Sequence, residues 1–539
     1  MNLMILLAAA VIMACVICNR ISNRFGVPTL LAFILLGMFF GSDGVIRIAF
    51  DNFDAAGQIC STALIFIMFY GGFGTKWSAA KPVMGRAVLL STAGVVLTAG
   101  VTGLFCCGVL GIEPAESFLI GSLISSTDAA SVFSILRSKR LNLKYRTASL
   151  LEVESGSNDP CSYMLTMIVL TVMEGGGIRI GGILWSMAAQ VVFGLSCGAA
   201  AAYVTKYALK HIRFTTEGFD TVFVFGMVLF SYAVPAAVGG NGYLSAYVFG
   251  ILLGNCKLKT KKALVHFFDG ITGLMQMLLF FLLGLLSFPS QLPEVMGIGL
   301  AVALFVTFAA RPFAVWIMMN PFQSRRNQRI FVSAAGLRGA ASIVFAIMAV
   351  TSPAKISHDV FHIVFFIVLF SILIQGTLLP IAAKKLDMID DKEDVLKTFS
   401  DYTEEVPVQF IEFRVKKNHP WAGSMVKDIL LPPETLLVQV RRRDTGEMVT
   451  PDGGTVLLEG DKMVLSARAN RVAKDVELSE LLLEEGNTWI GKRLSEISLE
   501  AGQLVVMVQR GEDVVIPNGG TELKAGDVLV IKEDFSDAI

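Results

Sequence analysis

Long apolar segments, separated by short polar stretches, fill the first 390 residues of the chain. Each segment has about 16 to 25 residues, the length that an α-helix needs to cross a lipid bilayer. The pattern predicts thirteen such helices, over residues 3–18, 26–42, 55–75, 87–110, 116–136, 149–173, 182–205, 218–236, 240–255, 264–287, 295–319, 329–351 and 358–383. We therefore expect an all-α membrane domain over residues 1–387, with about thirteen transmembrane helices.

Basic residues lie mainly in alternate connections between these helices. Of the 27 lysines and arginines in residues 1–390, 22 fall in one alternating set of connections, whereas the other set holds only Arg47, Arg179 and Lys355. Lysine and arginine in short loops stay on the cytoplasmic side of a membrane. This pattern predicts a multi-pass protein of the cell (inner or plasma) membrane, with its N-terminus outside and its C-terminal tail in the cytoplasm. The first span has no positively charged start and no cleavage site, so a membrane helix is favoured over a signal peptide.

A polar, charged tail follows the last span. Residues 391–539 contain 18 basic and 28 acidic residues, against 27 and 17 in residues 1–390, so an acidic tail is joined to a basic membrane part. Residues 388–405 are polar and acidic and are predicted to form a linker. Because the whole chain carries no net charge, a nucleic acid polymer is not an expected partner.

The tail is an internal repeat, with an offset of 68 residues that falls to 66 after a two-residue gap. The aligned pairs are His419–Gly423 with Asn487–Gly491, Leu436–Val440 with Leu504–Val508, Pro451–Thr455 with Pro517–Thr521, and Gly460–Asp461 with Gly526–Asp527. Each unit combines a short helical turn after its Trp-x-Gly motif with alternating apolar strands and glycine-rich turns. We predict two tandem cytoplasmic α+β domains, over residues 406–470 and 478–535.

Enzymatic chemistry has no support in the sequence. All eight cysteines lie in the membrane part without the paired spacing of a zinc site, and the five histidines are scattered. The chain contains no HExxH, Walker lysine loop or GxSxG motif. We therefore predict a protein that is not an enzyme and needs no cofactor.

Ionisable and polar residues inside apolar segments cluster in the fifth and sixth predicted helices. The fifth contains the segment Ser125–Asp128, and the sixth contains the segment Glu152–Pro160. A charged side chain at the centre of a bilayer costs roughly 2.5–3.5 kcal/mol on insertion scales. Each charged group in this cluster therefore needs a partner or a function.

The spacing on the sixth helix separates two polar faces. Ser155 and Asp159 form an i, i+4 pair with Glu152 one turn earlier, whereas Glu154 and Asn158 lie on the adjoining face. Asn158 is the only evident local companion of Asp159. A lone buried carboxylate that takes either a proton or a cation is the minimal requirement of an exchanger, because the two ligands then compete.

Glu154 requires a different explanation. The twelfth predicted helix carries Arg338 within residues 335–340, where two glycines weaken the helix. We expect Glu154 and Arg338 to neutralise each other as a structural ion pair. Arg311 and Gln375, in the eleventh and thirteenth spans, are assigned to packing or snorkelling.

The fifth and twelfth spans both contain small polar or glycine residues at mid-depth. This pattern is typical of discontinuous helices whose freed backbone groups line an ion site. Because these spans are seven apart, two six-helix halves, spans 1–6 and 8–13, would be related as inverted repeats. In that arrangement Asp128 would balance the partial positive charge of the half-helix N-termini.

The segments Ser126–Asp128, Glu154–Asp159 and Gly336–Gly339 resemble the motifs of the monovalent cation:proton antiporter-1 family, and the resemblance covers residues 1–390. It implies that Asp159 binds the cation and the proton in turn. It also implies that Ser155 and the backbone of Thr127 are further cation ligands, and that Glu154 and Arg338 form a stabilising pair. We add Asp128 and Asn158 to the residues that are expected to bind the ion or the proton.

Two residues refine this resemblance. Asn158, which precedes Asp159 where other members have a second aspartate, resembles the electroneutral branch of the family. Many relatives carry an acidic residue in the third span where this chain has Tyr70. The resemblance therefore leaves the choice of cation open.

Both tail units resemble the C-terminal RCK domain of the TrkA-C type, which is found on potassium channels and transporters. No GxGxxG half precedes them. The resemblance implies a cytoplasmic sensor that acts in a homodimer and binds a small ligand such as a cyclic dinucleotide. A dimerisation module without a ligand is the alternative.

These features predict a secondary active antiporter that exchanges K⁺, or alternatively Na⁺, for H⁺ without net charge movement and contributes to pH homeostasis. K⁺ is favoured because the tail resembles potassium-linked regulators. An RCK-gated monovalent cation channel is one alternative, but it would need a carbonyl filter such as TVGYG. A receptor that has lost transport is another, which the intact Asp159 disfavours.

Overall fold

The computed structural model describes residues 2–25, 29–138, 141–175, 180–212, 218–258, 260–390, 408–415, 419–431, 435–444, 447–468, 477–483, 487–497, 499, 504–510, 513–515 and 517–533. Residues 391–405 of the predicted linker lie outside this set, as do five of the basic residues used for orientation, Lys139, Arg140, Arg179, Arg213 and Lys259. The chain divides into two compact units, residues 1–403 and 404–539, which are described separately.

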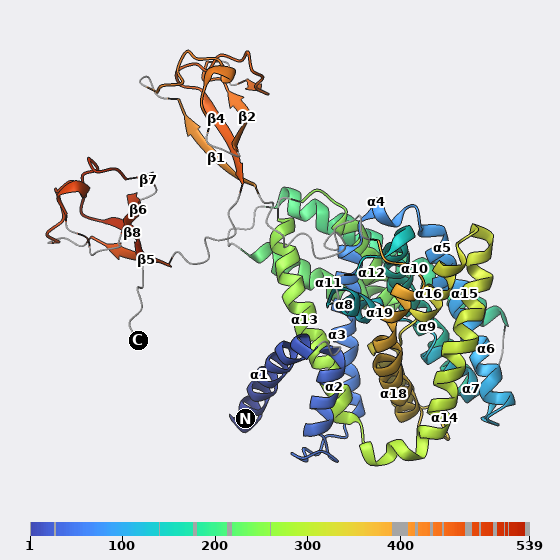
Figure 1. The fold of residues 1–539 in the computed structure, drawn as a ribbon. Helices are drawn as coiled ribbons and strands as arrows, with labels where there is room; N and C mark the ends of the chain where they lie inside the picture. The colour runs from blue at the N-terminus through green and yellow to red at the C-terminus, as the bar shows by residue number, and fades with distance from the viewer. Residues whose placement is uncertain are drawn as a thin grey trace. The chain divides into compact units, whose positions relative to one another are not determined.

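Each of the thirteen predicted spans coincides with helical structure in the first unit (Figure 1). Eight are single helices: α1 (Asn2–Phe25), α2 (Thr29–Phe40), α3 (Phe53–Gly74), α9 (Thr147–Met173), α10 (Ile180–His211), α11 (Phe219–Ala237), α12 (Gly242–Gly254) and α13 (Lys261–Leu286). The predicted separation of α11 from α12 is confirmed. Gly239 supplies a positive φ in the turn, and the side chain of Asn241 caps α12 by accepting from the amide of Leu244.

The fourth, eleventh and thirteenth spans each contain a π-helical turn, a distortion that is frequent at functional sites. The pieces are α5 (Met84–Leu89), η1 (Leu90–Gly94) and α6 (Val95–Gly108); α14 (Leu292–Phe305), η4 (Val306–Ala310) and α15 (Arg311–Met319); and α18 (Val360–Phe370), η6 (Ser371–Gln375) and α19 (Gly376–Lys385).

The fifth and twelfth spans are broken helices, as predicted. Residues 124–128 separate α7 (Pro114–Leu123) from α8 (Ala129–Ser138), and residues 335–339 separate α16 (Arg326–Ala334) from α17 (Ala340–Val350). A short helix, α4 (Trp77–Ala80), lies in the connection between the third and fourth spans.

Among the described residues, seven helices are long and apolar enough to cross a membrane without interruption. The 27-residue α9 is not one of them, because its polar residues lower its hydropathy. The remaining predicted spans are shorter apolar helices or broken ones. The span that carries Asp159 is therefore long enough to cross a membrane but less apolar than those seven helices.

Glycines allow α12 to pack tightly against α3. A Cβ on Gly250 would overlap the carbonyl of Phe69, and one on Gly72 would overlap the carbonyl of Tyr247. Small residues let helix backbones approach closely where lipid supplies no hydrophobic driving force. This contact fixes the position of Tyr247, which takes part in it on α12, and of Tyr70, which follows Phe69 on α3.

The end of the membrane unit folds back onto the connection between the fifth and sixth spans. Leu143 and Ile389 form an isolated β-bridge, and Met388 is completely buried. Residues 387–390, which we call the strap, therefore belong to the membrane unit, although the linker was predicted to begin at residue 388.

In the second unit, each half forms a four-stranded antiparallel sheet (Figure 1). The first has the order β1-β4-β2-β3, from β1 (Val408–Arg414), β2 (Thr435–Arg441), β3 (Met448–Val449) and β4 (Lys462–Arg468). The second has the order β5-β8-β6-β7, from β5 (Glu477–Leu482), β6 (Leu504–Arg510), β7 (Asp513–Val515) and β8 (Asp527–Glu533). Equal strand order confirms the repeat. The turn predicted after each Trp-x-Gly is a single 3₁₀ turn, at Val426–Asp428 and Leu494–Glu496, and the described part of the tail contains no α-helix.

One ion pair recurs in both halves of the tail. Arg442 pairs with Asp461 at 2.6 Å, and Arg510 pairs with Asp527 at 2.7 Å. In the second half, hydrogen bonds from the Arg510 side chain lower the pKa of Asp527. The pair joins the end of β6 to the start of β8 and so holds the sheet together.

Candidate ion-binding site

The two unwound segments, 124–128 and 335–339, meet inside the membrane unit. The amide of Asp128 donates to the carbonyl of Leu337 over 2.8 Å. Gly339 makes this approach possible, because a Cβ on it would overlap the side chain of Asp128. Each break therefore helps to satisfy backbone groups that the other break has released.

Arg338 braces this crossing. Its Nη1 donates to the carbonyls of Ser125, at 3.0 Å, and Ser126, at 2.7 Å, and its side chain is buried. These carbonyls follow the C-terminus of α7, where carbonyls lack intrahelical partners and the helix dipole is negative. Arg338 therefore stabilises the broken helix through backbone carbonyls.

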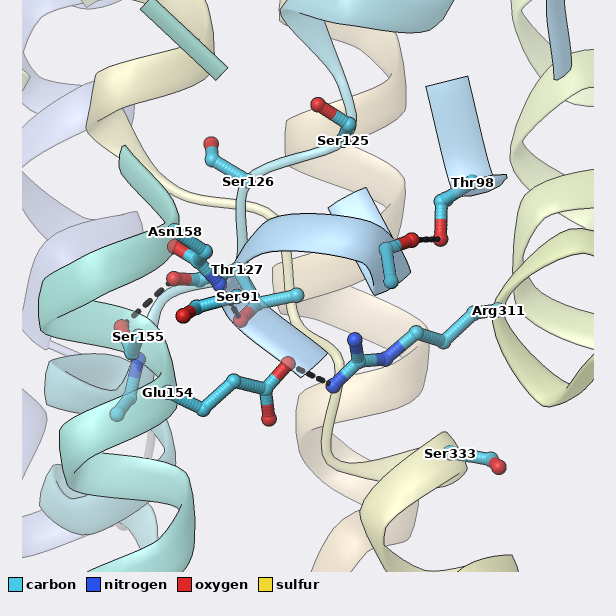
Figure 2. Close-up of polar contacts among 12 residues, drawn as sticks. Ser91, Thr98, Ser125, Ser126, Thr127, Glu154, Ser155, Asn158, Arg311 and Ser333 are labelled. Carbon is cyan, nitrogen blue, oxygen red and sulfur yellow. Dashed lines mark hydrogen bonds and ion pairs between the residues drawn. The ribbon is translucent and has the colours of Figure 1, made fainter. Parts of the chain in front are cut away.

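The predicted ion pair between Glu154 and Arg338 has the wrong basic partner. Oε1 of Glu154 lies 2.6 Å from Nη2 of Arg311, an ion pair that Figure 2 shows, and both side chains are buried. Arg311 is thus neither a packing nor a snorkelling residue, because it opens α15 inside the protein and neutralises a charge on α9. A charge in an apolar span without an acidic residue requires a partner on another helix. That signal marks Arg311 as a candidate partner of Glu154, but it marks Arg338 equally.

Three of the predicted ligands, Thr127, Ser155 and Asn158, contact one another (Figure 2). The Ser155 hydroxyl donates to the Thr127 carbonyl over 2.7 Å and accepts from the amide of Ala129 over 2.9 Å. Nδ2 of Asn158 donates to Oγ1 of Thr127 over 2.5 Å. A hydroxyl and a carbonyl each have two lone pairs, so Ser155 and the Thr127 carbonyl both retain one for a cation.

Asp128 caps α8. Its carboxylate accepts from the amide of Ser131 over 3.1 Å and from the Ser131 hydroxyl over 2.5 Å. A carboxylate at this position is favoured by the partial positive charge of a helix N-terminus. The structure therefore places Asp128 at a half-helix N-terminus, where it also lines the cavity described next.

A cavity of about 750 Å³ adjoins these residues. Thr127, Asp128, Ser155 and Asp159 line it, and Asp159 is 7% exposed. Among the described residues, no ion pair joins Asp159 to a basic side chain. Its carboxylate can therefore take up a proton or a small cation from the cavity.

A second wall of the cavity consists of residues that were not predicted from the sequence. The hydroxyl of Tyr70, on α3, donates to Oδ1 of Asp269 on α13 over 3.0 Å, and both residues line the cavity. Asp269, Thr272 and Gln276 line it at spacings of three and four residues, so one face of α13 is polar. This stripe within an apolar span was the signal in the sequence. Tyr247, on α12, also lines the cavity and had no such signal.

The described residues contain no group of three or more histidine, cysteine, aspartate or glutamate side chains that could hold a metal ion. The cavity instead offers isolated carboxylates together with hydroxyl, amide and carbonyl oxygens. A buried carboxylate without an ion pair to a described basic residue, beside two crossing helix breaks in a multi-pass helical protein, defines a transporter of small ions rather than an enzyme.

Comparison with known families agrees with this class. Residues 7–385 match the family described as "Sodium/hydrogen exchanger, transmembrane", and residues 410–474 and 478–536 each match the TrkA-C domain. The chain belongs to the sodium/hydrogen exchanger family and is a monovalent cation/proton antiporter with two TrkA-C domains.

Similar proteins cover most of the chain. The K⁺/H⁺ antiporter NhaP of Alkalimonas amylolytica is 32% identical over 87% of this chain and 82% of its own length. The K⁺/H⁺ antiporter NhaP2 of Shewanella sp. (strain MR-4) is 31% identical over 85% of this chain and 80% of its own length. The fold of the sodium proton antiporter MjNhaP1 from Methanocaldococcus jannaschii at pH 8 matches 70% of this chain and 100% of its own, with a TM-score of 0.60 and 22% identity.

Proposed function

We propose that this protein exchanges K⁺, in preference to Na⁺, for H⁺ across the cell membrane in an electroneutral cycle. Asp159 carries the proposal, because it is a buried, cavity-lining carboxylate without an ion pair to a described basic residue. Asp159 binds either one proton or one monovalent cation, so the loaded site has the same net charge in both halves of the cycle. Exchange therefore moves no net charge across the membrane. The relatives named as K⁺/H⁺ antiporters support K⁺ as the cation.

Cation and proton compete for the same carboxylate. In the cation-bound state, Asp159, the Ser155 hydroxyl and the Thr127 carbonyl coordinate the ion, replacing part of its hydration shell. Asn158 holds the Thr127 side chain, and Asp128 fixes the end of the unwound segment. Protonation of Asp159 removes its negative charge and so releases the cation.

An inverted repeat is the framework we infer for alternating access. Breaks occur in spans five and twelve, and two of the three π-helical turns occur in spans four and eleven, so these features recur seven spans apart. Such repeats allow one group of helices to move against another around a fixed site. The Glu154–Arg311 pair and the Arg338 brace hold the helices on either side of that site.

Proteoliposomes test the exchange directly. We expect K⁺, and less effectively Na⁺ or Li⁺, to dissipate a preset pH gradient at a rate that does not depend on membrane potential. Asp159→Asn should abolish this activity while the protein still elutes as a folded species. Asp220→Asn, at the start of α11 and away from the cavity, is the matched control. Full exchange by Asp159→Asn, or a potential-driven current without proton movement, would overturn the proposal.

We also propose a topology and a role for the tail. The basic connections support an outside N-terminus and a cytoplasmic tail. The TrkA-C match supports a homodimer whose tail binds a small ligand, such as a cyclic dinucleotide, and favours one transport state. Adding cyclic dinucleotides to full-length protein should change the K⁺ concentration dependence of exchange. Identical kinetics with and without them would leave the tail as a dimerisation module.

A further inference from the structure

We propose that Asp269, Tyr70 and Thr272 form an outer cation-binding position in the cavity, which the monovalent cation occupies before it reaches Asp159. This inference rests on the proposed cation exchange. It places a second set of cation ligands on α3 and α13, separate from the ligands around Asp159 and the helix crossing.

The Tyr70–Asp269 contact replaces a carboxylate that the third span lacks. Tyr70 stands where the family resemblance leads one to expect an acidic side chain, and its hydroxyl instead donates to Asp269 on α13 at 3.0 Å. The cavity therefore still has an anionic group beside α3, provided by a different helix. Among the described residues, Asp269 forms no ion pair, so its charge remains available to a cation.

The hydroxyl of Thr272 is an independent indication of a ligand. This side chain is 6% exposed and lines the cavity, yet its hydroxyl has no hydrogen-bond partner among the described residues. Other helical threonines, such as Thr98, Thr102 and Thr166, donate to the carbonyl four residues earlier. A buried hydroxyl without a partner is unfavourable. The position of Thr272 in the cavity wall indicates that its partner is a solute in that cavity.

The two groups lie on one face of one helix. Asp269 and Thr272 are three residues apart on α13, and Gln276 follows four residues later, so carboxylate, hydroxyl and amide oxygens line a path of roughly 10 Å. These are the oxygen ligands that replace water around a monovalent cation.

Tyr247 extends this polar wall toward the inner site. Its hydroxyl also lacks a partner among the described residues, and its side chain is 3% exposed. The ring contacts the position where a Cβ on Gly156 would lie, next to Ser155. The cavity wall thus offers oxygen atoms from the outer position to the predicted ligands of Asp159.

The outer position is outer only relative to Asp159, and it faces the side of the membrane that carries the basic connections. Asp269 lies about two turns from Lys261, where α13 begins, and this end follows the Lys257–Lys262 connection. In the proposed topology this side is the cytoplasm. The outer position should therefore affect cation uptake from the cytoplasmic face and leave the opposite face unchanged.

Exchange kinetics of oriented full-length protein test the proposal. Asp269→Asn should raise the KM for K⁺ on the tail side about tenfold while kcat stays within about twofold, because loss of one ligand that is not in the exchange step weakens binding. Thr272→Val and Tyr70→Phe should raise the same KM by smaller factors, and Asp269→Glu should restore most of it. Asp220→Asn, which removes a carboxylate outside the cavity, should change nothing.

Equilibrium binding separates this proposal from the proposed function. Radioactive rubidium should still bind weakly to Asp159→Asn, and adding Asp269→Asn should remove that binding. An unchanged KM in Asp269→Asn, or a fall in kcat alone, would overturn the outer position while leaving the antiporter intact. Exchange that persists in Asp159→Asn would instead overturn the proposed function. Should Asp269→Asn fail to fold, Thr272→Val gives the answer, since it removes a hydroxyl that makes no hydrogen bond to a described residue.

Discussion

The carboxylate of Glu154 and the guanidinium of Arg311 lie 2.6 Å apart in the membrane unit, with 0% and 2% of their side chains exposed. Neither residue lines the cavity that contains Asp159, although Glu154 is on the same helix. A Cβ on Gly336 would lie 2.9 Å from Nε of Arg311, so the pair also packs against the break in the twelfth span. The pair therefore connects α9 to the helix crossing without lining the cavity.

Arg311→Met should strongly destabilise the protein. Removing one member of a buried ion pair leaves the other charge uncompensated, which costs about 3–5 kcal/mol. Thermal unfolding in detergent should show this loss. The double variant Glu154→Gln with Arg311→Met should recover part of it, because no buried charge then remains. A single variant as stable as the parent protein would show that the pair is not structural.

Gly339→Ala should disrupt the crossing of the two broken helices. A methyl group at this position would overlap the side chain of Asp128, so residues 124–128 or 335–339 must move. We expect lower thermal stability and at least a tenfold loss of K⁺/H⁺ exchange. Gly100→Ala on α6 is the matched control, since no described atom outside the adjoining turns of its own helix lies within 4 Å of the added Cβ. Equal effects of the two substitutions would argue against a tight crossing.

The sequence allowed the fold of the membrane unit to be predicted because its signals are local. Apolar length marks each helix, and the polar and glycine residues near Asp128 and Arg338 mark the two breaks. The grouping of Ser155, Asn158 and Asp159 follows from helical spacing on one short segment. Each of these inferences needs only residues that are close in the chain.

The errors concern contacts between distant segments. Glu154 had two buried arginines available, and only the packing of α15 against the fourth span and of Arg338 against α7 decides between them. The bond from Tyr70 to Asp269 joins α3 to α13, whose relative rotation is fixed by packing that no local pattern records.

Acid should weaken the second tail domain through Asp527. Hydrogen bonds from Arg510 hold the folded-state pKa of Asp527 below its ordinary value. The ionised form therefore stabilises the domain above the unfolded-state pKa of about 3.9, and this contribution is lost as the pH falls through the folded-state pKa. Hydrogen exchange in β6 and β8 should accelerate below about pH 4. Asp527→Asn should already show faster exchange at pH 7 and a flatter pH dependence, with β2 and β4 as the internal reference.

Truncation at either end of the strap should separate stability from regulation. A chain ending after Asp390 keeps the buried Met388 and the Lys144–Asp387 ion pair of 2.8 Å, so it should retain its thermal stability and K⁺/H⁺ exchange but lose any response of the tail. A chain ending after Leu386 loses both contacts beside the connection that leads into α9. Replacing a buried methionine with alanine costs about 2–5 kcal/mol, and we expect a loss of at least this size. Met388→Ala in the full chain should reproduce most of that destabilisation, because the side chain is completely buried. Equal unfolding temperatures for the two truncated chains would mean that the strap does not stabilise the membrane unit.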